Sequence, residues 1–404
     1  DAQLDQRGGW HRLCPRPLAL REVLQQVNRD DLADAWQAGN EETIGWVYQF
    51  FSQEEKNAVF QRLYRDKKKV RRQDIAPATE LFTPRWYVKF LVQNSLGRHW
   101  LQMHPDSDLG NQLDYLVPVK GEVREVPLKP VAEITMLDPA CGTMHFGLVA
   151  FDLFVEMYRE EIAKAGQPGW PTQASVDSED EIPAAIIADN LYGIDIDLRA
   201  VQLSALTLYL KAKTLNPTAQ VSESHLACAD IDLPSEEELD EFISDMAFQQ
   251  PVYERAIRAM WHGLEDVGQL GSLTRVEDHL RNIVQQERTK FADELSLFTS
   301  DELFRDAYRS DESFWEVLDA QIVQAFDEFA RRKAKSGEDR AFFRSEAVKG
   351  CELLDVLTRR YDIVTTNPPY MTRRNMNETM ADFLKNAYPN TKGDLYAAFI
   401  ERCG

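Results

Sequence analysis

The chain has 404 residues, 44% of them hydrophobic, and is long enough for two or three domains with a sizeable core. It contains no run of eighteen apolar residues, which argues against a membrane-spanning segment. Its five scattered cysteines give neither a disulfide framework nor a paired zinc spacing, so we expect a reducing cytoplasm and no metal. The net charge of −21 argues against strong DNA binding by the segment as a whole.

The first region, residues 1–78, is predicted to be helical, because aromatic and aliphatic residues such as Trp46, Phe50 and Val59 recur at helical spacing. It ends in the one dense basic run, Arg65–Arg72. That run suits either contact with DNA or a solvated helix face. The residues in question are Lys67, Lys68, Lys69, Arg71 and Arg72.

A buried strand is expected from Ile134 to Asp138, running into a turn of small residues at Ala140–Thr143. Such a turn lets a ligand approach the backbone. An apolar helix should follow from about His145 to Tyr158.

A second strand and helix repeat this pattern. Leu191–Asp197 predicts a short strand that ends in carboxylates, and Leu198–Lys213 predicts the helix after it. An acid at the carboxyl end of such a strand suits ribose hydroxyls. A third strand at Leu226–Ala229 ends at Asp230, and an acidic loop at about 167–182 precedes the second strand.

A large helical insertion is predicted between the third strand and a fourth, over residues 231–355. It opens with acidic residues, so we expect it to contact a partner protein more readily than DNA. One of its helices has an apolar face that suits packing against a core. The residues on that face are Phe314, Val317, Leu318, Ile322, Phe326 and Phe329.

The fourth strand, Tyr361–Thr366, runs into Asn367-Pro368-Pro369-Tyr370. An amide oxygen and a proline-locked carbonyl can both accept hydrogen bonds from a planar amine, and the tyrosine ring can stack on the attached heterocycle. This turn predicts a site for alkylation of an amino group. All four predicted strands end at polar residues, so we expect these strand ends to form one cleft.

The chain resembles the adenine-specific DNA methyltransferases that use S-adenosylmethionine. The resemblance lies in the order of its motifs: the turn after the first strand, the acidic second strand, the third strand and then Asn-Pro-Pro-Tyr. The resemblance runs from about Phe82 to the end. Within that family the chain looks most like the BREX phage-exclusion methyltransferases of the PglX type and the single-chain type II restriction-modification methylases. Further cues are Leu81–Trp86 and Lys392–Tyr396.

The resemblance implies roles residue by residue. Phe82 and Thr83 would close over the methionine part of the cofactor, and Asp195 would hold its ribose. The cofactor's adenine would meet Asp230 and pack on Leu395 or Phe399. The residues beneath the methionine part would be Asp138, Ala140, Cys141, Gly142 and Thr143. The target adenine of double-stranded DNA would be held by Asn367, Pro368, Pro369 and Tyr370, with Arg373 and Arg374 as candidates for the DNA backbone.

One departure is Met144, where the family commonly has a second glycine. Its side chain could crowd the cofactor or point away. Two other functions stay open: a protein methyltransferase acting on glutamine, and a non-catalytic, cofactor-binding DNA-surveillance subunit that works with other defence-system proteins.

The predicted fold is a doubly wound α/β sheet of the methyltransferase type with a helical amino-terminal region and a helical insertion. Its core would comprise residues 79–230 and 356–404. We expect this core to be truncated at the carboxyl end, and the chain to begin inside a longer one.

Overall fold

A computed structural model describes residues 17–37, 39–118, 126–221, 224–231, 235–246, 251–264, 266–276, 278, 349–350 and 352–404. Within these residues, four parallel strands form one sheet in the order β3-β2-β1-β4. The chain builds outward from β1 to β3 and then returns to the other side of β1, so the strand order reverses between β1 and β4. In an open α/β sheet, ligands bind at such a reversal. The strands are β1 (Met136–Asp138), β2 (Leu191–Asp195), β3 (His225–Cys228) and β4 (Ile363–Val364).

The predicted α/β fold is confirmed, including the long helices after the first two strands. These are α7 (His145–Lys164) and α9 (Leu198–Leu215). The first four residues of β2 are all buried, as expected for a parallel strand that is covered on both faces. The strand β4 is shorter than predicted, since the Asp362 carboxylate takes the Thr135 N–H over 3.0 Å before the ladder begins.

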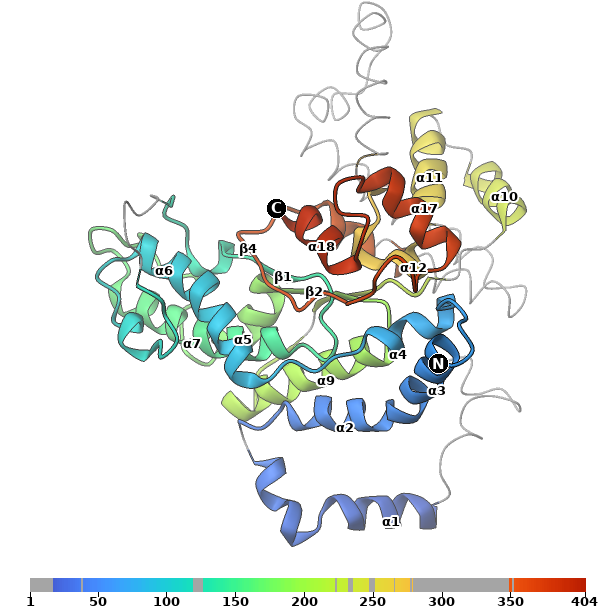
Figure 1. Ribbon diagram of the computed structural model, residues 1–404. Helices are drawn as coiled ribbons and strands as arrows, with labels where there is room; N and C mark the ends of the chain where they lie inside the picture. Colours follow the sequence, from blue (N-terminus) through green and yellow to red (C-terminus); the bar gives the residue numbers. More distant parts are fainter. Residues whose placement is uncertain are drawn as a thin grey trace, which may run out of the picture.

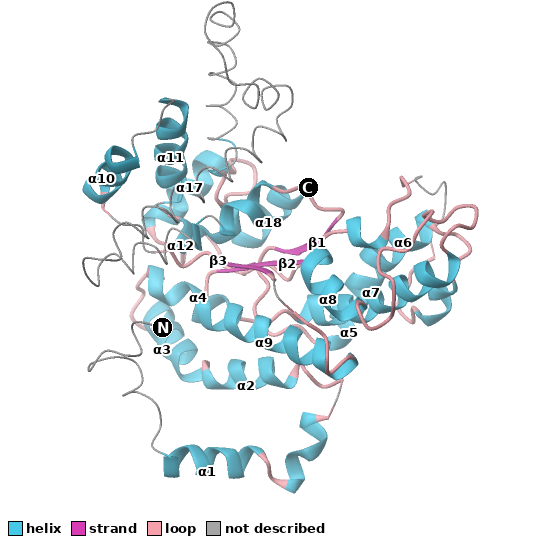
Figure 2. Ribbon diagram, turned by 180° about the vertical axis from the view of Figure 1, so that it is seen from behind, coloured by secondary structure: helices cyan, strands magenta, loops and turns pink. Residues whose placement is uncertain are grey.

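Helices cover both faces of this sheet (Figures 1 and 2). Both views show α9 and α2 on one side, with α1 beyond them, and α17 and α18 on the other. The amino-terminal region is mostly helical where the structure describes it, as predicted, but residues 65–71 are not helical. Its elements are α1 (Pro17–Val27), η2 (Asp30–Trp36), α2 (Thr43–Phe51), α3 (Gln53–Tyr64), η3 (Arg72–Asp74) and α4 (Ile75–Thr79).

One hydrophobic cluster joins α7 to the helices before β1. The α7 side chains of Phe151, Phe154 and Tyr158 are at most 1% exposed, and burial of each stabilises the fold by about 2 kcal/mol. This cluster fixes β1 and the turn after it. The neighbouring elements are α5 (Arg85–Val92), η4 (Gln93–Gly97), α6 (Arg98–Met103), η5 (Asp108–Gln112), η6 (Val131–Glu133), α8 (Ile182–Ala185) and η7 (Ile186–Asn190).

A second cluster gathers segments that are far apart in the sequence. Ile75 of α4, Leu270 and Leu273 pack with Leu395 and Phe399. Part of the predicted insertion therefore lies against the sheet domain. The apolar face at 314–329 lies outside the described residues. The remaining elements are α10 (Glu236–Met246), α11 (Pro251–Leu264), α12 (Val267–Leu270), η8 (Gly271–Leu273), α17 (Glu378–Ala387) and α18 (Leu395–Cys403).

Candidate active site

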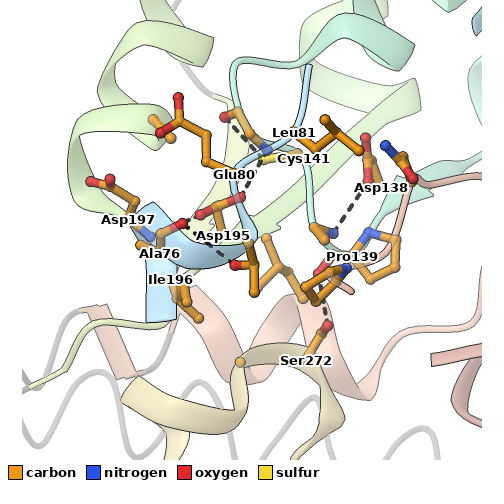
Figure 3. Close-up of a pocket in the computed structure, with 18 of the residues that line it drawn as sticks. Ala76, Glu80, Leu81, Asp138, Pro139, Cys141, Asp195, Ile196, Asp197 and Ser272 are labelled. Atoms are coloured by element: carbon orange, nitrogen blue, oxygen red, sulfur yellow. Dashed lines mark hydrogen bonds between the residues drawn. The ribbon is translucent and has the colours of Figure 1, made fainter. Parts of the chain in front are cut away.

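A cavity opens where β1 and β2 end, beside the turn that follows β4. In Figure 3, Asp138 stands on one side of it, with Glu80, Asp195 and Asp197 on the other. Residues from six separate stretches line this cavity, so only the folded chain brings them together. Those stretches are 75–83, 138–146, 194–200, 269–273, 367–369 and 395–399, together with Tyr48.

The turn after β1 is held by its own backbone and by β2. Cys141 N–H donates to the Ile194 carbonyl over 2.9 Å, and Gly142 N–H donates to Asp195 Oδ2 over 2.8 Å. Gly142 has a φ of 53°, which glycine adopts without the Cβ penalty. The turn therefore stays close to the cavity with no side chain at Gly142 to fill it.

Three polar atoms of lining residues are buried and have no hydrogen-bond partner among the described residues. They are Asp138 Oδ2, Thr143 Oγ1 and His145 Nε2. Buried polar atoms normally have partners, and a bound ligand can supply them. The ammonium, carboxylate and hydroxyl groups of S-adenosylmethionine offer suitable donors and acceptors, so the residues present fit this cofactor.

The acids of the cavity have shifted pKa values. Burial raises the pKa of Asp138 to about 7, against the neighbouring Thr366 hydroxyl and the Ala140 N–H, which lower it. Burial also raises the pKa of Asp195 to about 6, against backbone hydrogen bonds that lower it. Burial also raises the pKa of Glu80 to about 7. A cationic ligand would favour the ionised form of all three carboxyl groups.

The acid at the end of β2, Asp195, binds two backbone N–H groups. Asp195 Oδ2 accepts from Gly142 N–H, and Asp195 Oδ1 accepts from Asp197 N–H over 2.8 Å. The two oxygens of a carboxylate offer about four acceptor sites, so Asp195 fixes the turn and can still accept from a ligand hydroxyl.

The next acid, Asp197, ties the amino-terminal helices to this edge of the sheet. It accepts from the Tyr48 hydroxyl and from Arg199. Burial acts to raise the pKa of Asp197, but these two partners outweigh it and the net shift is downward. The α2 helix is therefore anchored beside the cavity.

Asn367 lines the same cavity, together with Pro369. Its Nδ2 group donates to Thr83 Oγ1 over 2.9 Å, and its Oδ1 accepts from the Tyr370 hydroxyl over 3.0 Å. Pro368 and Tyr370 lie outside the lining, and Tyr370 is 54% exposed. The amide thus stands between the cavity and an exposed aromatic ring.

Residues 189–404 match the Eco57I restriction-modification methylases, and this match covers more than half of the chain. The chain belongs to that family.

Two curated proteins resemble this Eco57I-family chain over nearly all of its length. The adenine-specific methyltransferase BrxX of Escherichia coli O9:H4 (strain HS) is 29% identical over 392 residues, which are 95% of this chain and 29% of BrxX. The adenine-specific methyltransferase PglX of Lacticaseibacillus casei (strain Zhang) is 29% identical over 402 residues, which are 95% of this chain and 28% of PglX. The chain thus spans less than a third of the length of either relative.

Most of the residues that the sequence resemblance assigns to cofactor binding line the cavity at the ends of β1 and β2. They are Phe82, Thr83, Asp138, Ala140, Cys141, Gly142, Thr143, Asp195, Leu395 and Phe399. Asp230 is not among them. Its side chain is 57% exposed and pairs with Arg72 over 3.4 Å, whereas the flanking Ala229 and Ile231 are buried.

Met144 lies in the core, away from the cavity lining. Its side chain is 1% exposed and packs so close to Gly147 that a Cβ there would lie 2.6 Å from Met144 Cε. The backbone takes the left-handed conformation with a φ of 64°. The turn therefore accommodates the methionine at the cost of backbone strain.

The basic run does not form a helix face, so that interpretation was wrong. α3 ends at Tyr64, and Lys67 has a φ of 53°, which interrupts the helix. Arg71 pairs with Asp74 over 2.8 Å, whereas Lys68 and Lys69 are exposed. Arg373 and Arg374 are exposed just beyond the turn at Asn367.

Sequence reasoning missed several residues of the cavity wall. Tyr48, Glu80 and His145 line it, as does the stretch 269–273 of the predicted insertion. Ser272 Oγ donates to the Pro139 carbonyl over 2.7 Å, which joins this stretch to the turn after β1. No local motif marks these residues, because only tertiary packing brings them to the site.

No group of acidic, histidine or cysteine side chains in the described parts of the chain could hold a metal ion. The described helices also include none that is long and apolar enough to cross a membrane.

Proposed function

We propose that this chain binds S-adenosylmethionine in the cavity and transfers its methyl group to the exocyclic amine of adenine in double-stranded DNA. The observation that carries the proposal is that Asn367 lines the same cavity as the turn after β1. The family membership and the names of both relatives support it.

The cofactor site that we propose uses the cavity lining. Asp138 and the backbone of residues 140–143 would hold the methionine part, beneath Phe82. Asp195 would accept from the ribose, with Leu395 and Phe399 against the adenine ring. All of these residues line the cavity, and the unpaired Asp138 Oδ2 can accept from an ammonium group.

The protein's task in this reaction is placement. The cofactor supplies an electrophilic methyl group on a sulfonium. Asn367 Oδ1 and the Pro368 carbonyl would accept from the target amine, which directs its nitrogen lone pair toward the methyl group. Tyr370 would stack on the flipped base. As the new N–C bond forms, the bond between the methyl carbon and the sulfonium sulfur would break, and its electron pair would stay on the sulfur of the neutral thioether that leaves. The amine loses one proton, which solvent can take.

The domain organisation that we propose keeps the predicted boundaries, with a core at 79–230 and 356–404. Residues 1–78 and 231–355 would surround it. In support, the first core segment supplies β1, β2 and β3, and the second supplies β4.

We place the reaction in the cytoplasm, where host DNA is the substrate, as the modification step of a BREX-type or restriction-modification system. Other components of that system are the proposed protein partners. The sequence resemblance to BREX methyltransferases supports this setting.

The test is methyl transfer by the complete gene product to DNA from a host that lacks the gene. Labelled S-adenosylmethionine should mark adenine, and Asn367→Ala should lower the rate by about 100-fold or more, since it removes the acceptor for the amine. Asn375→Ala is the matched control, because Asn375 lies near the turn but outside the cavity lining. Labelling of a release factor in place of DNA would support the glutamine methyltransferase alternative, and no labelling would support the non-catalytic one.

A further inference from the structure

A hydrogen bond between Thr83 and Asn367 joins two segments that are far apart in the sequence. Asn367 Nδ2 donates to Thr83 Oγ1 over 2.9 Å, and Thr83 is 8% exposed. Nearby, the hydroxyls of Ser95 and Thr365 lie 3.1 Å apart. The chain around α5 is therefore attached at two points to the end of β4 and the turn after it.

The Thr83 hydroxyl accepts from the Nδ2 end of the Asn367 amide, and this leaves Oδ1 as the end beside Tyr370. The oxygen and nitrogen of an asparagine amide differ little in shape, so a neighbouring group has to fix their positions. If Nδ2 faced a target amine, both groups would present N–H donors and no hydrogen bond could form between them. With Nδ2 engaged by Thr83, Oδ1 stays on the side where the Tyr370 hydroxyl donates to it.

We propose that Thr83 is a positioning residue, whose hydroxyl accepts from Asn367 Nδ2 and so presents Oδ1 to the exocyclic amine of adenine. This inference rests on the proposed function and adds a role beyond contact with the cofactor. Because Thr83 also lines the cavity and follows Phe82, the segment that covers the cofactor and the amide that holds the base form one connected unit.

The first test compares Thr83→Val, which keeps the shape and removes the acceptor, with Thr83→Ser, which keeps the hydroxyl. In the complete gene product, Thr83→Val should lower kcat about tenfold, as expected for loss of one buried hydrogen bond. The Kd for S-adenosylmethionine should change by a smaller factor than kcat, because Thr83 lines the cofactor cavity but this bond acts on the amide. Thr83→Ser should keep most of the activity. Ser95→Ala breaks the neighbouring link to Thr365 and a local hydrogen bond to the Leu91 carbonyl, and it should leave kcat unchanged.

Three outcomes would overturn the inference. Thr83→Val could keep the wild-type kcat. The whole loss of activity in Thr83→Val could come from weaker cofactor binding, which would mean that Thr83 only contacts the cofactor. Ser95→Ala could lose as much as Thr83→Val, which would mean that general anchoring of α5 is what matters.

A double-mutant cycle that measures the unfolding equilibrium tests the contact without an activity assay. Thr83→Val and Asn367→Ala should couple by roughly fivefold in the unfolding equilibrium constant, and strict additivity would overturn the proposal. If the wild-type protein methylates no DNA, the proposed function fails and the role toward adenine fails with it. If methylation survives Thr83→Val intact, only this inference fails.

Discussion

The hydroxyl of Tyr370 donates to Asn367 Oδ1, which is the oxygen that the proposed reaction needs for the target amine. The ring is 54% exposed, and its centre lies 5.9 Å from that of Tyr396. The hydroxyl therefore takes one of the two acceptor sites of this oxygen and competes there with an entering amine. Movement of the ring to stack on the base would release this contact.

Substitutions at Tyr370 should separate these two effects. Tyr370→Phe removes the competing hydroxyl and keeps the ring, so kcat/KM for DNA should stay at the wild-type value or rise by up to about fivefold. Tyr370→Ala loses the stacking surface, worth about 1–3 kcal/mol, and should raise KM for DNA by tenfold or more. Steady-state methylation kinetics measure both. A Phe variant as impaired as the Ala variant would show that the hydroxyl itself is needed.

Met144 combines backbone strain with good packing, and the two can be separated. Met144→Ala loses the buried side chain but keeps the strained φ, at a cost of about 2–5 kcal/mol. Met144→Gly loses the same packing but relieves about 1 kcal/mol of strain. The midpoint of chemical unfolding should therefore fall in the order wild type, Met144→Gly, Met144→Ala.

Cofactor affinity should hardly change in either Met144 variant, since the side chain lies outside the cavity lining. Isothermal titration calorimetry with S-adenosylmethionine measures it directly. Much tighter binding by Met144→Gly would show that the methionine does obstruct the site.

At the scale of elements, the carboxyl ends of β1 and β2 set the pH dependence of the site. Burial raises the pKa of Asp138 to about 7 and that of Asp195 to about 6, so the ligand-free protein keeps protons on these groups that the unfolded chain has lost. The stabilisation from this proton uptake is present below about pH 4 and is lost as pH rises through 6 to 7. A cationic ligand reverses the preference, because it favours both ionised forms.

Affinity for S-adenosylmethionine should therefore increase as pH rises from 5 to 7, by up to about tenfold for ionisation of Asp195 on binding and up to about fiftyfold for ionisation of Asp138. Below pH 7 the α-amino group of the cofactor stays mostly protonated, so the change belongs to the protein. Titration calorimetry across this range should show proton release on binding. Asp138→Asn should bind more weakly and flatten the profile, whereas a profile that stays as steep would assign the effect to other groups.

The same elements show how far the sequence predicts the structure. Hydrophobic patterns predicted β1 to β4 and the helices α7 and α9, since these depend on local periodicity. The polar residues at the ends of β1 and β2 and after β4 also meet in one cavity, as parallel topology requires. Asp230 differs, because its carboxylate is exposed and pairs with Arg72 from another part of the chain. The bond from Thr83 to Asn367 had no sequence signal for the same reason.

At the scale of the whole molecule, a net charge of −21 has to be reconciled with DNA as the proposed substrate. Phosphate contacts come from a few local cations, so the distribution of charge matters more than its sum. Part of the basic run is already neutralised, since Arg71 pairs with Asp74 and Arg72 with Asp230. Lys68 and Lys69 are exposed beside these pairs.

Replacement of Lys67, Lys68 and Lys69 by alanine should therefore reduce the salt dependence of DNA binding. Each lost phosphate contact lowers the slope of log K against log salt by about 0.9, so the triple variant should lose up to roughly 2.7 units of slope. Binding by the complete gene product across a salt series measures it. Arg21→Ala on α1, which both Figures 1 and 2 place on the far side of α2 from the sheet, is the control and should keep the wild-type slope. An unchanged slope in the triple variant would remove these lysines from the interface and leave Arg373 and Arg374, beside the target-amine turn, as the cations to test next.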